Sequence, residues 1–288
     1  MPKLNYDTPP PAPPLIFFMP GIGEVESRAW EPFGHIVRAI PLSYFDWTEL
    51  VKPETTFADL ISHLKTQIQS QVSGEGPLDI VGYSIGGPLA YACVEALQAE
   101  GRSINSLTIL DGRTTGSPPT TLRTRWNNFT TFQVRAGLAS VIAKVLTRER
   151  FIPLLRRLSP WRHAWLPFRF GDYVHTKIKM QLMVRMFLPW WTSAGGSNSR
   201  LATPTYLFRS EQHEPDESEG LGWSAYCSDL TIIHVAGSHL SMLAPENFGR
   251  LCGELARVLA GGIQSTIATD LPPTPSTGSL NDEPLRVR

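Results

Sequence analysis

The chain has 288 residues with 26 basic and 26 acidic side chains, so its formal net charge is zero. This balance gives no general attraction to a polyanion such as nucleic acid. Hydrophobic residues make up 42% of the chain, as in ordinary globular proteins, and the length suits one large α/β domain or two small ones. No apolar run approaches the ~18 residues of a membrane-spanning helix, so we expect no membrane span.

The cysteines and the first residues indicate a reducing compartment. Cys93, Cys227 and Cys252 are far apart and leave no pair at the spacing of a metal site, so we expect neither a disulfide framework nor a zinc site. The first residues lack the basic stretch and apolar segment of a secretion signal. We therefore expect a cytoplasmic protein.

Both ends of the chain are predicted to be disordered. Residues 1–13 form a proline-rich lead-in, and residues 263–288 combine Pro, Thr, Ser and Gly with charged residues and have little to bury. We predict one folded domain over residues 14–262, with an insertion at about residues 113–200.

Strands and helices alternate along this domain. The predicted strands are Leu15–Met19, a short strand within Ile36–Phe45, Leu78–Val81, Ser106–Leu110, Thr205–Phe208 and Leu230–Val235. The predicted helices are one before the second strand, Thr56–Gln71, Pro88–Leu97 and Glu246–Ala260. This alternation predicts the α/β class, with a mostly parallel sheet covered by helices on both faces.

A tight turn separates the third predicted strand from the following helix. In Gly82-Tyr83-Ser84-Ile85-Gly86, glycine stands two positions before and two positions after a serine. Glycine fits a sharp strand-to-helix turn because it has no Cβ. The turn raises the Ser84 hydroxyl above the sheet, so we predict Ser84 as a nucleophile and the Ile85 amide as an oxyanion donor. The alternative is a structural turn with a chemically idle serine.

Two more polar residues follow predicted strands. Asp111 comes directly after Ser106–Leu110, and His239 lies in the loop after Leu230–Val235. Parallel sheets bind ligands outside the carboxyl ends of their strands. The chain order of Ser84, Asp111 and His239 resembles that of the catalytic triad of α/β-hydrolases. We therefore predict His239 as the general base and Asp111 as the acid that orients it.

Other acids compete with Asp111, because many hydrolases of this class place the acid after the next strand. The acids available there are Glu211, Glu214, Asp216 and Glu217. We favour Asp111 because it follows an apolar strand, whereas the others lie in a polar loop. His234, within the last predicted strand, is expected to pack there.

A second oxyanion donor is expected in the loop after the first strand, because that strand neighbours the nucleophile strand in this fold. The candidates are Gly21 and Ile22. A plain turn at these residues is the equally simple alternative.

The insertion between Asp111 and the strand at Thr205 is about ninety residues long, far longer than an ordinary connection. From Arg113 to Arg185 it has fourteen basic side chains against two acidic ones, interleaved with many aromatic and methionine side chains. One interpretation is a helical lid over an apolar substrate chamber, with a basic outer surface that attracts an acidic partner or a phosphate. The other is a lid whose arginines are solvated and whose aromatics form its own core.

The chain also resembles, nearly throughout its folded part, the thioesterase family that releases products from nonribosomal peptide and polyketide synthases, including its free-standing members. The matching segments are Phe18-Met19-Pro20-Gly21, Gly82-Tyr83-Ser84-Ile85-Gly86-Gly87 with Ala90-Tyr91, Leu110-Asp111, Gly222-Trp223, and Gly237-Ser238-His239 with Met242-Leu243.

The resemblance implies Ser84 as nucleophile, Asp111 as acid and His239 as base, with oxyanion amides from Ile85 and the Gly21–Ile22 region. It implies a small-molecule acyl thioester carried on the phosphopantetheine arm of an acidic acyl or peptidyl carrier protein, and no cofactor or metal of the enzyme itself. We therefore expect a serine thioesterase of the α/β-hydrolase fold. The alternatives are a carboxylesterase or lipase acting on free esters, and a hydrolase-fold binding protein that has lost catalysis.

Overall fold

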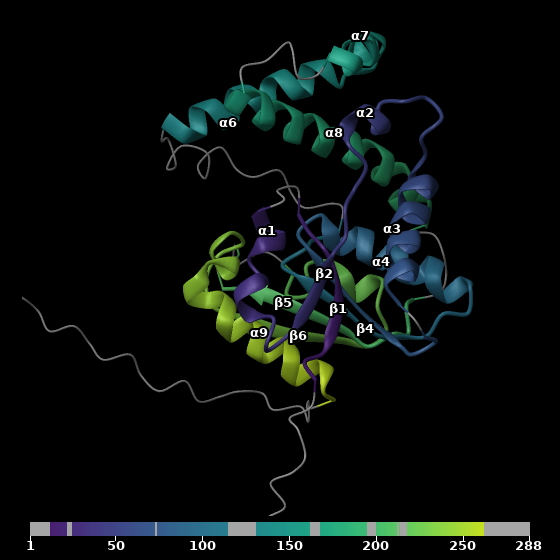
Figure 1. Cartoon of the computed structure of the whole chain (residues 1–288), viewed down its shortest axis with the longest axis vertical. Coiled ribbons are helices and arrows are strands. Elements are labelled where there is room, and N and C mark those ends of the chain that lie inside the picture. Colours follow the sequence, from purple (N-terminus) through teal and green to yellow (C-terminus); the bar gives the residue numbers. More distant parts are fainter. Residues whose placement is uncertain are drawn as a thin grey trace, which may run out of the picture.

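The computed structural model describes residues 12–21, 25–72, 74–114, 131–161, 168–194, 200–211, 213 and 218–261. In these residues, one parallel sheet has the strand order β2-β1-β3-β4-β5-β6 (Figure 1). The strands are β1 (Leu15–Met19), β2 (Arg38–Pro41), β3 (Leu78–Tyr83), β4 (Ile104–Leu110), β5 (Thr205–Ser210) and β6 (Leu230–Val235). The sheet order confirms that the first strand neighbours the strand before Ser84.

Helices cover both faces of the sheet. They are α1 (Val25–Arg28), α2 (Trp47–Leu50), α3 (Phe57–Gln71), α4 (Gly86–Ala99), α6 (Thr131–Leu146), α7 (Ile152–Leu158), α8 (Phe168–Ala194) and α9 (Pro245–Leu259). In Figure 1, α9 and α1 lie on one side of the sheet, α3 and α4 lie on the other, and the lid helices α6, α7 and α8 form a separate layer. The α/β class and the helical insertion predicted from the sequence are confirmed.

The core has two parts because side chains of a strand alternate between its faces. In β1, Phe17 and Met19 join the cluster under α3 and α4. Ile16 and Phe18 join the cluster under α9, where the Phe18 ring lies edge-on to Trp30 at a centroid distance of 5.0 Å. Strands buried on both faces are apolar throughout, which is why they were recognisable from the sequence.

Helices α3 and α9 form where the sequence has an amphipathic pattern. In α3, the Thr56 side chain accepts from the Asp59 amide and the Asp59 carboxylate accepts from the Thr56 amide, which satisfies two backbone donors at the helix start. Leu60, Leu64 and Ile68 then bury one face. In the described part of the chain, no helix is long and apolar enough to cross a bilayer.

One local prediction is wrong. His234 in β6 was expected to pack within the sheet, but more than half of its side chain is exposed, and its Nε2 lies 3.6 Å from an Oε1 of Glu219. The reason is that β6 is the last strand in the sheet order, so most of its residues are only partly buried. The predicted disordered ends lie, apart from residues 12 and 13, outside the described residues, and the predicted domain limits stay a prediction.

The turn after β3 depends on two glycines. A Cβ at Gly82 would overlap the Gly86 carbonyl, and a Cβ at Gly86 would overlap the carbonyl oxygen of Met19 at the end of β1. The turn is therefore pressed directly against the first strand, which explains why the sequence has glycine at both positions.

We predict that Gly86→Ala lowers the free energy of unfolding by about 1–3 kcal/mol or more, because the added methyl group meets rigid backbone. The matched control is Gly253→Ala in α9, where a Cβ would meet nothing within 4 Å. This control should raise stability by about 0.5–1 kcal/mol, because alanine favours a helix. Urea denaturation measures both, and equal effects of the two substitutions would contradict the prediction.

Candidate active site

Ser84 occupies a strained turn between β3 and α4. Its φ is 54°, in the left-handed region that a serine rarely adopts. The conformation is held by hydrogen bonds from the Ser84 amide to the Leu110 carbonyl (3.0 Å) and from the Gly87 amide to the Ser84 carbonyl (3.0 Å). Such strain, stored at a half-buried serine, is characteristic of functional sites.

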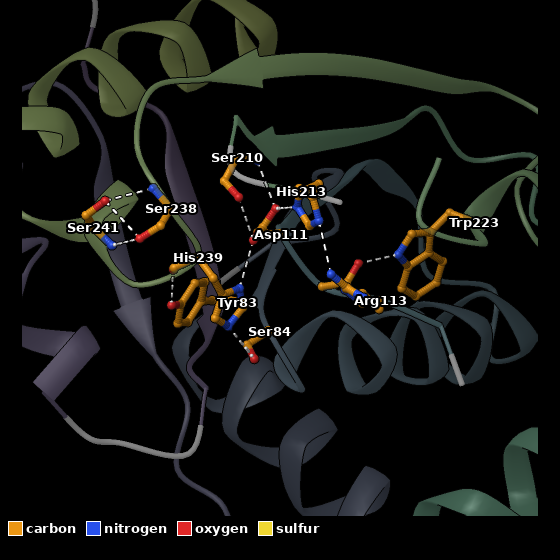
Figure 2. A network of polar contacts seen from close by, with 11 residues as sticks. Tyr83, Ser84, Asp111, Arg113, Ser210, His213, Trp223, Ser238, His239 and Ser241 are labelled. Carbon is orange, nitrogen blue, oxygen red and sulfur yellow. Dashed lines mark hydrogen bonds and ion pairs between the residues drawn. The ribbon is translucent and has the colours of Figure 1, made fainter. Parts of the chain in front are cut away.

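His239 lies beside this serine, at the start of the segment after β6. Its Nε2 is 3.0 Å from Ser84 Oγ. The neighbouring Tyr83 fixes the histidine in two ways, because its ring stacks on the imidazole at a centroid distance of 5.1 Å and its hydroxyl donates to the His239 carbonyl at 2.5 Å. The Ser238 amide also donates to Ser241 Oγ at 2.7 Å, which closes the loop (Figure 2).

Asp111 completes a chain of contacts with these two residues. Its Oδ2 lies 2.8 Å from His239 Nδ1, and its own φ is 51°. The side chain is fully buried. The structure therefore brings together Ser84, His239 and Asp111, the three residues that the sequence placed at the ends of different strands (Figure 2).

Three more contacts surround the carboxylate. The Ser210 amide donates to Oδ1 at 2.8 Å, the Ser210 hydroxyl donates to Oδ2 at 3.0 Å, and His213 Nε2 lies 2.7 Å from Oδ1. Burial by itself would raise the pKa of Asp111, but the hydrogen bonds from His239, His213 and the Ser210 amide outweigh it and hold the pKa well below its usual value. Asp111 is thus kept ionised.

The competing acids do not occupy this position in the described residues. Glu211 is exposed, and its backbone amide donates to the Gly237 carbonyl at 3.1 Å. Glu214, Asp216 and Glu217 lie outside the described residues. Among the described acids, Asp111 is the one in hydrogen-bond contact with His239.

Two of the predicted oxyanion donors, Ile85 and Gly21, lie beside the serine turn. Ile85 is the N-cap of α4, so its amide belongs to the start of that helix. On the other side, the Tyr44 hydroxyl donates to the Pro20 carbonyl at 2.6 Å. Because the N–H and C=O of a trans peptide point in opposite directions, this bond also fixes the direction of the Gly21 amide. Ile22 lies outside the described residues, and the oxyanion site stays a prediction.

A cavity of about 450 Å³ opens above Ser84. Its lining residues are Ser84, Ile85, Pro88, Asp111, Arg113, Thr114, His213 and His239 from the loops at the sheet edge, and Val184, Phe187 and Leu188 from α8. The lid therefore supplies an apolar wall opposite the polar groups, which is the composition of a pocket for a small organic molecule.

The sequence left two interpretations of the lid open, a wall of a substrate chamber or a layer with its own core, and its aromatic and basic residues include examples of both. Phe187 lines the cavity, whereas Trp191 is buried against Tyr226 at a centroid distance of 4.4 Å. Among the basic residues, Arg156 Nε donates to the Val51 carbonyl at 2.7 Å and so fixes α7 to the end of α2. Others are exposed on α6, α7 and the turn between them: Lys144, Arg148, Arg150 and Arg157.

The cysteines offer no alternative nucleophile. Burial raises the pKa of Cys93 to about 12, that of Cys227 to about 11 and that of Cys252 to about 12, so all three remain thiols near neutral pH. In the part of the chain that the structure describes, no three His, Cys, Asp or Glu side chains are placed to hold a metal ion.

Sequence reasoning missed several residues of the site. His213 and Ser210 contact Asp111 directly, yet they lie at and beyond the end of β5 with no motif around them. Trp223 was noted only through the family resemblance, and its indole nitrogen donates to the Gly112 carbonyl at 2.8 Å, next to Asp111. The one available signal was the position of the polar segment after β5, at the carboxyl edge of the sheet.

The parallel sheet, the strained serine turn and the Ser84–His239–Asp111 contacts define an α/β-hydrolase. A model of the thioesterase domain family matches residues 36–259. The chain belongs to the thioesterase domain family and is an enzyme of the thioesterase type. This confirms the family resemblance seen in the sequence.

Solved structures show the same fold. The chain is 17% identical to a NocB thioesterase domain in covalent complex with a fluorophosphonate nocardicin G analog, covering 87% of this chain and 96% of that chain with a TM-score of 0.57. It is 15% identical to RedJ with a PEG molecule in the active site, covering 89% and 97% with a TM-score of 0.54. It is 16% identical to the surfactin thioesterase domain SrfTE, covering 85% and 91% with a TM-score of 0.52.

The lowered pKa of Asp111 predicts how stability changes in acid. The unfolded carboxyl takes up a proton near pH 4, while the folded one stays ionised to lower pH, so its contribution to stability is present above about pH 4 and is lost as the pH falls below that value. The free energy of unfolding of Asp111→Asn should therefore be lower than that of wild type by about 2 kcal/mol or more at pH 7. This difference should shrink between about pH 4 and pH 2.

Denaturant titrations of both proteins across this pH range measure the effect. Parallel stability curves for wild type and Asp111→Asn would contradict it.

Proposed function

We propose that this enzyme is a serine thioesterase that releases an acyl, peptidyl or polyketide chain from the phosphopantetheine arm of a carrier protein through an acyl-Ser84 intermediate. The observation that carries the proposal is the continuous contact from Ser84 Oγ through the His239 ring to the Asp111 carboxylate, at the floor of a cavity with an apolar wall. Membership of the thioesterase domain family supports the thioester as the bond that is broken.

In the first half of the reaction, Ser84 Oγ attacks the thioester carbon while His239 Nε2 accepts the hydroxyl proton. The ionised Asp111 stabilises the imidazolium that forms, because its Oδ2 accepts from Nδ1. The tetrahedral intermediate collapses, the carbon–sulfur bond breaks, and His239 returns the proton to the leaving thiolate. The acyl group is then bound to Ser84 as an ester.

In the second half, water or a nucleophile within the substrate attacks the ester. His239 removes its proton and returns it to Ser84 Oγ, which restores the enzyme. In both halves the amide of Ile85, with that of Gly21 or Ile22, would donate to the oxyanion. The start of α4 favours negative charge there, which supports this role for Ile85.

The structural neighbours support the carrier-bound substrate. The NocB thioesterase domain comes from the nocardicin cluster, and the thioesterase domain SrfTE cyclises the lipopeptide antibiotic surfactin. A four-domain nonribosomal peptide synthetase also contains a region of this fold, with which this chain shares 16% identity and a TM-score of 0.52. The exposed basic residues of the lid suit an acidic carrier protein.

We expect that Ser84→Ala folds normally and lowers turnover at least about a thousandfold, because it removes the hydroxyl that contacts His239 Nε2. The protein is incubated with an acyl-loaded carrier protein and, separately, with the matching simple ester, and intact mass is followed. Wild type should gain and then lose the acyl group from the carrier, while Ser84→Ala should gain none.

Comparable acylation by the simple ester would assign the enzyme to the carboxylesterases instead. Near-normal turnover by Ser84→Ala would overturn the proposed nucleophile. If neither substrate acylates wild type and a fluorophosphonate probe also fails to label it, a binding role replaces catalysis.

Carrier docking is tested at Arg157, which is exposed on α7, rather than at Arg156, which is bound to the Val51 carbonyl. Arg157→Glu should raise KM for the carrier-bound substrate by about threefold to tenfold and leave turnover of a small thioester unchanged, because the change acts on association. The matched control is Arg250→Glu on α9, another exposed arginine, outside the lid. The docking hypothesis fails if both variants give the same KM as wild type while remaining folded.

A further inference from the structure

We propose that His213 is a positioning residue for the acyl transfer, and that Arg113 keeps its ring in the neutral form in which it works. The inference rests on the proposed function, because it assigns a role relative to Asp111 and His239. Neither His213 nor Arg113 belongs to the sequence motifs that predicted the site. Both line the cavity above Ser84.

The two nitrogens of His213 have different partners. Nε2 lies 2.7 Å from Asp111 Oδ1, and Nδ1 lies 3.1 Å from Arg113 Nη2 (Figure 2). A guanidinium has only donors, so Nδ1 has to be the acceptor in this pair. The proton of the neutral ring is then on Nε2, where it donates to the carboxylate. Arg113 and the ionised Asp111 therefore require the same tautomer, and Arg113 also disfavours a proton on Nδ1.

This tautomer completes the set of hydrogen bonds on Asp111. Each carboxylate oxygen has two partners, which are the Ser210 amide and His213 on Oδ1, and the Ser210 hydroxyl and His239 on Oδ2. An ionised carboxylate has about four acceptor sites, so the group is fully satisfied and cannot rotate without breaking bonds. The direction in which Oδ2 faces His239 is fixed as a result.

The charge state of His213 is as important as its position. A cationic ring would carry an Nδ1–H that faces the Arg113 guanidinium, donor against donor. It would also compete with the imidazolium of His239 for the single negative charge of Asp111 during the reaction. A neutral donor avoids both effects, because it orients the carboxylate while leaving its charge to stabilise His239.

The burial of His213 supports a role in the interior of the site. Its side chain is 5% exposed, although it comes from a polar segment after β5. His234 provides a matched contrast, because it is a histidine of the neighbouring strand β6 with a side chain that is 55% exposed and a contact to Glu219.

The test compares His213→Leu with His213→Gln in the full chain, with His234→Leu and His234→Gln as controls. Leucine removes the donor to Asp111, while glutamine keeps an N–H that can reach it. We expect His213→Leu to lower kcat for the acyl-loaded carrier protein about 10-fold to 100-fold, with KM nearly unchanged. The kcat of His213→Gln should remain within about threefold of the wild-type value. The rate of labelling by a fluorophosphonate probe should follow the same order, and the His234 variants should match wild type.

Proton and nitrogen NMR of protein with labelled histidine separates positioning from a merely structural role. The Nδ1–H resonance of His239, which faces Asp111, should shift in His213→Leu and return in His213→Gln. The His213 ring of wild type should show the Nε2–H tautomer with no proton on Nδ1. Arg113→Met should keep the Nε2–H that faces Asp111 and permit a second proton on Nδ1. If His213→Leu does not fold, the protonation of His213 Nδ1 in wild type and in Arg113→Met decides the question.

The outcomes distinguish the two proposals. Absence of labelling at Ser84 in wild type would overturn the proposed function, while the NMR results would still decide whether His213 holds Asp111. The positioning role alone would be overturned if wild type is labelled normally, His213→Leu has the same kcat as wild type, and the His239 resonance is unchanged in that variant. An Nδ1–H tautomer of His213 in wild type would also overturn it.

Discussion

A buried negative charge at the carboxyl edge of the sheet organises the site. The Asp111 side chain is excluded from solvent, and such a charge destabilises a fold unless hydrogen bonds compensate it. Its partners come from the end of β5 and the segments that follow β5 and β6, at Ser210, His213 and His239. The ends of three strands are therefore joined at one carboxylate. The geometry that orients the histidine is the same geometry that makes the buried charge tolerable.

The other half of the site is fixed by steric fit. The turn at Ser84 contacts the first strand so closely that Gly86 has no room for a Cβ, and the strained φ of the serine is maintained by this contact and by backbone hydrogen bonds. Tyr83, one residue earlier, holds His239 by stacking and by its hydroxyl. The segment Tyr83–Ser84 thus positions both the Ser84 hydroxyl and the His239 ring, independently of the lid.

The parts of the molecule that could be predicted from the sequence are those that depend on local pattern. Strands such as Leu15–Met19 are apolar because both faces are buried, and residues directly after such strands meet at one sheet edge, which brought Ser84, Asp111 and His239 into the prediction. His213 could not be found in this way, because its contact depends on the path of an irregular segment. His234 was misplaced because periodicity does not reveal which strand lies at the edge.

The two walls of the cavity have separate origins in the sequence. The polar wall comes from loops at the sheet edge, whereas the apolar wall comes from a single stretch of α8 at Val184, Phe187 and Leu188. These three side chains have no place in the hydrogen-bond network around Asp111. Mutation along one helical turn can therefore change which acyl chain is accepted while the chemistry is inherited intact. In such an architecture, substrate range and reaction type can evolve independently.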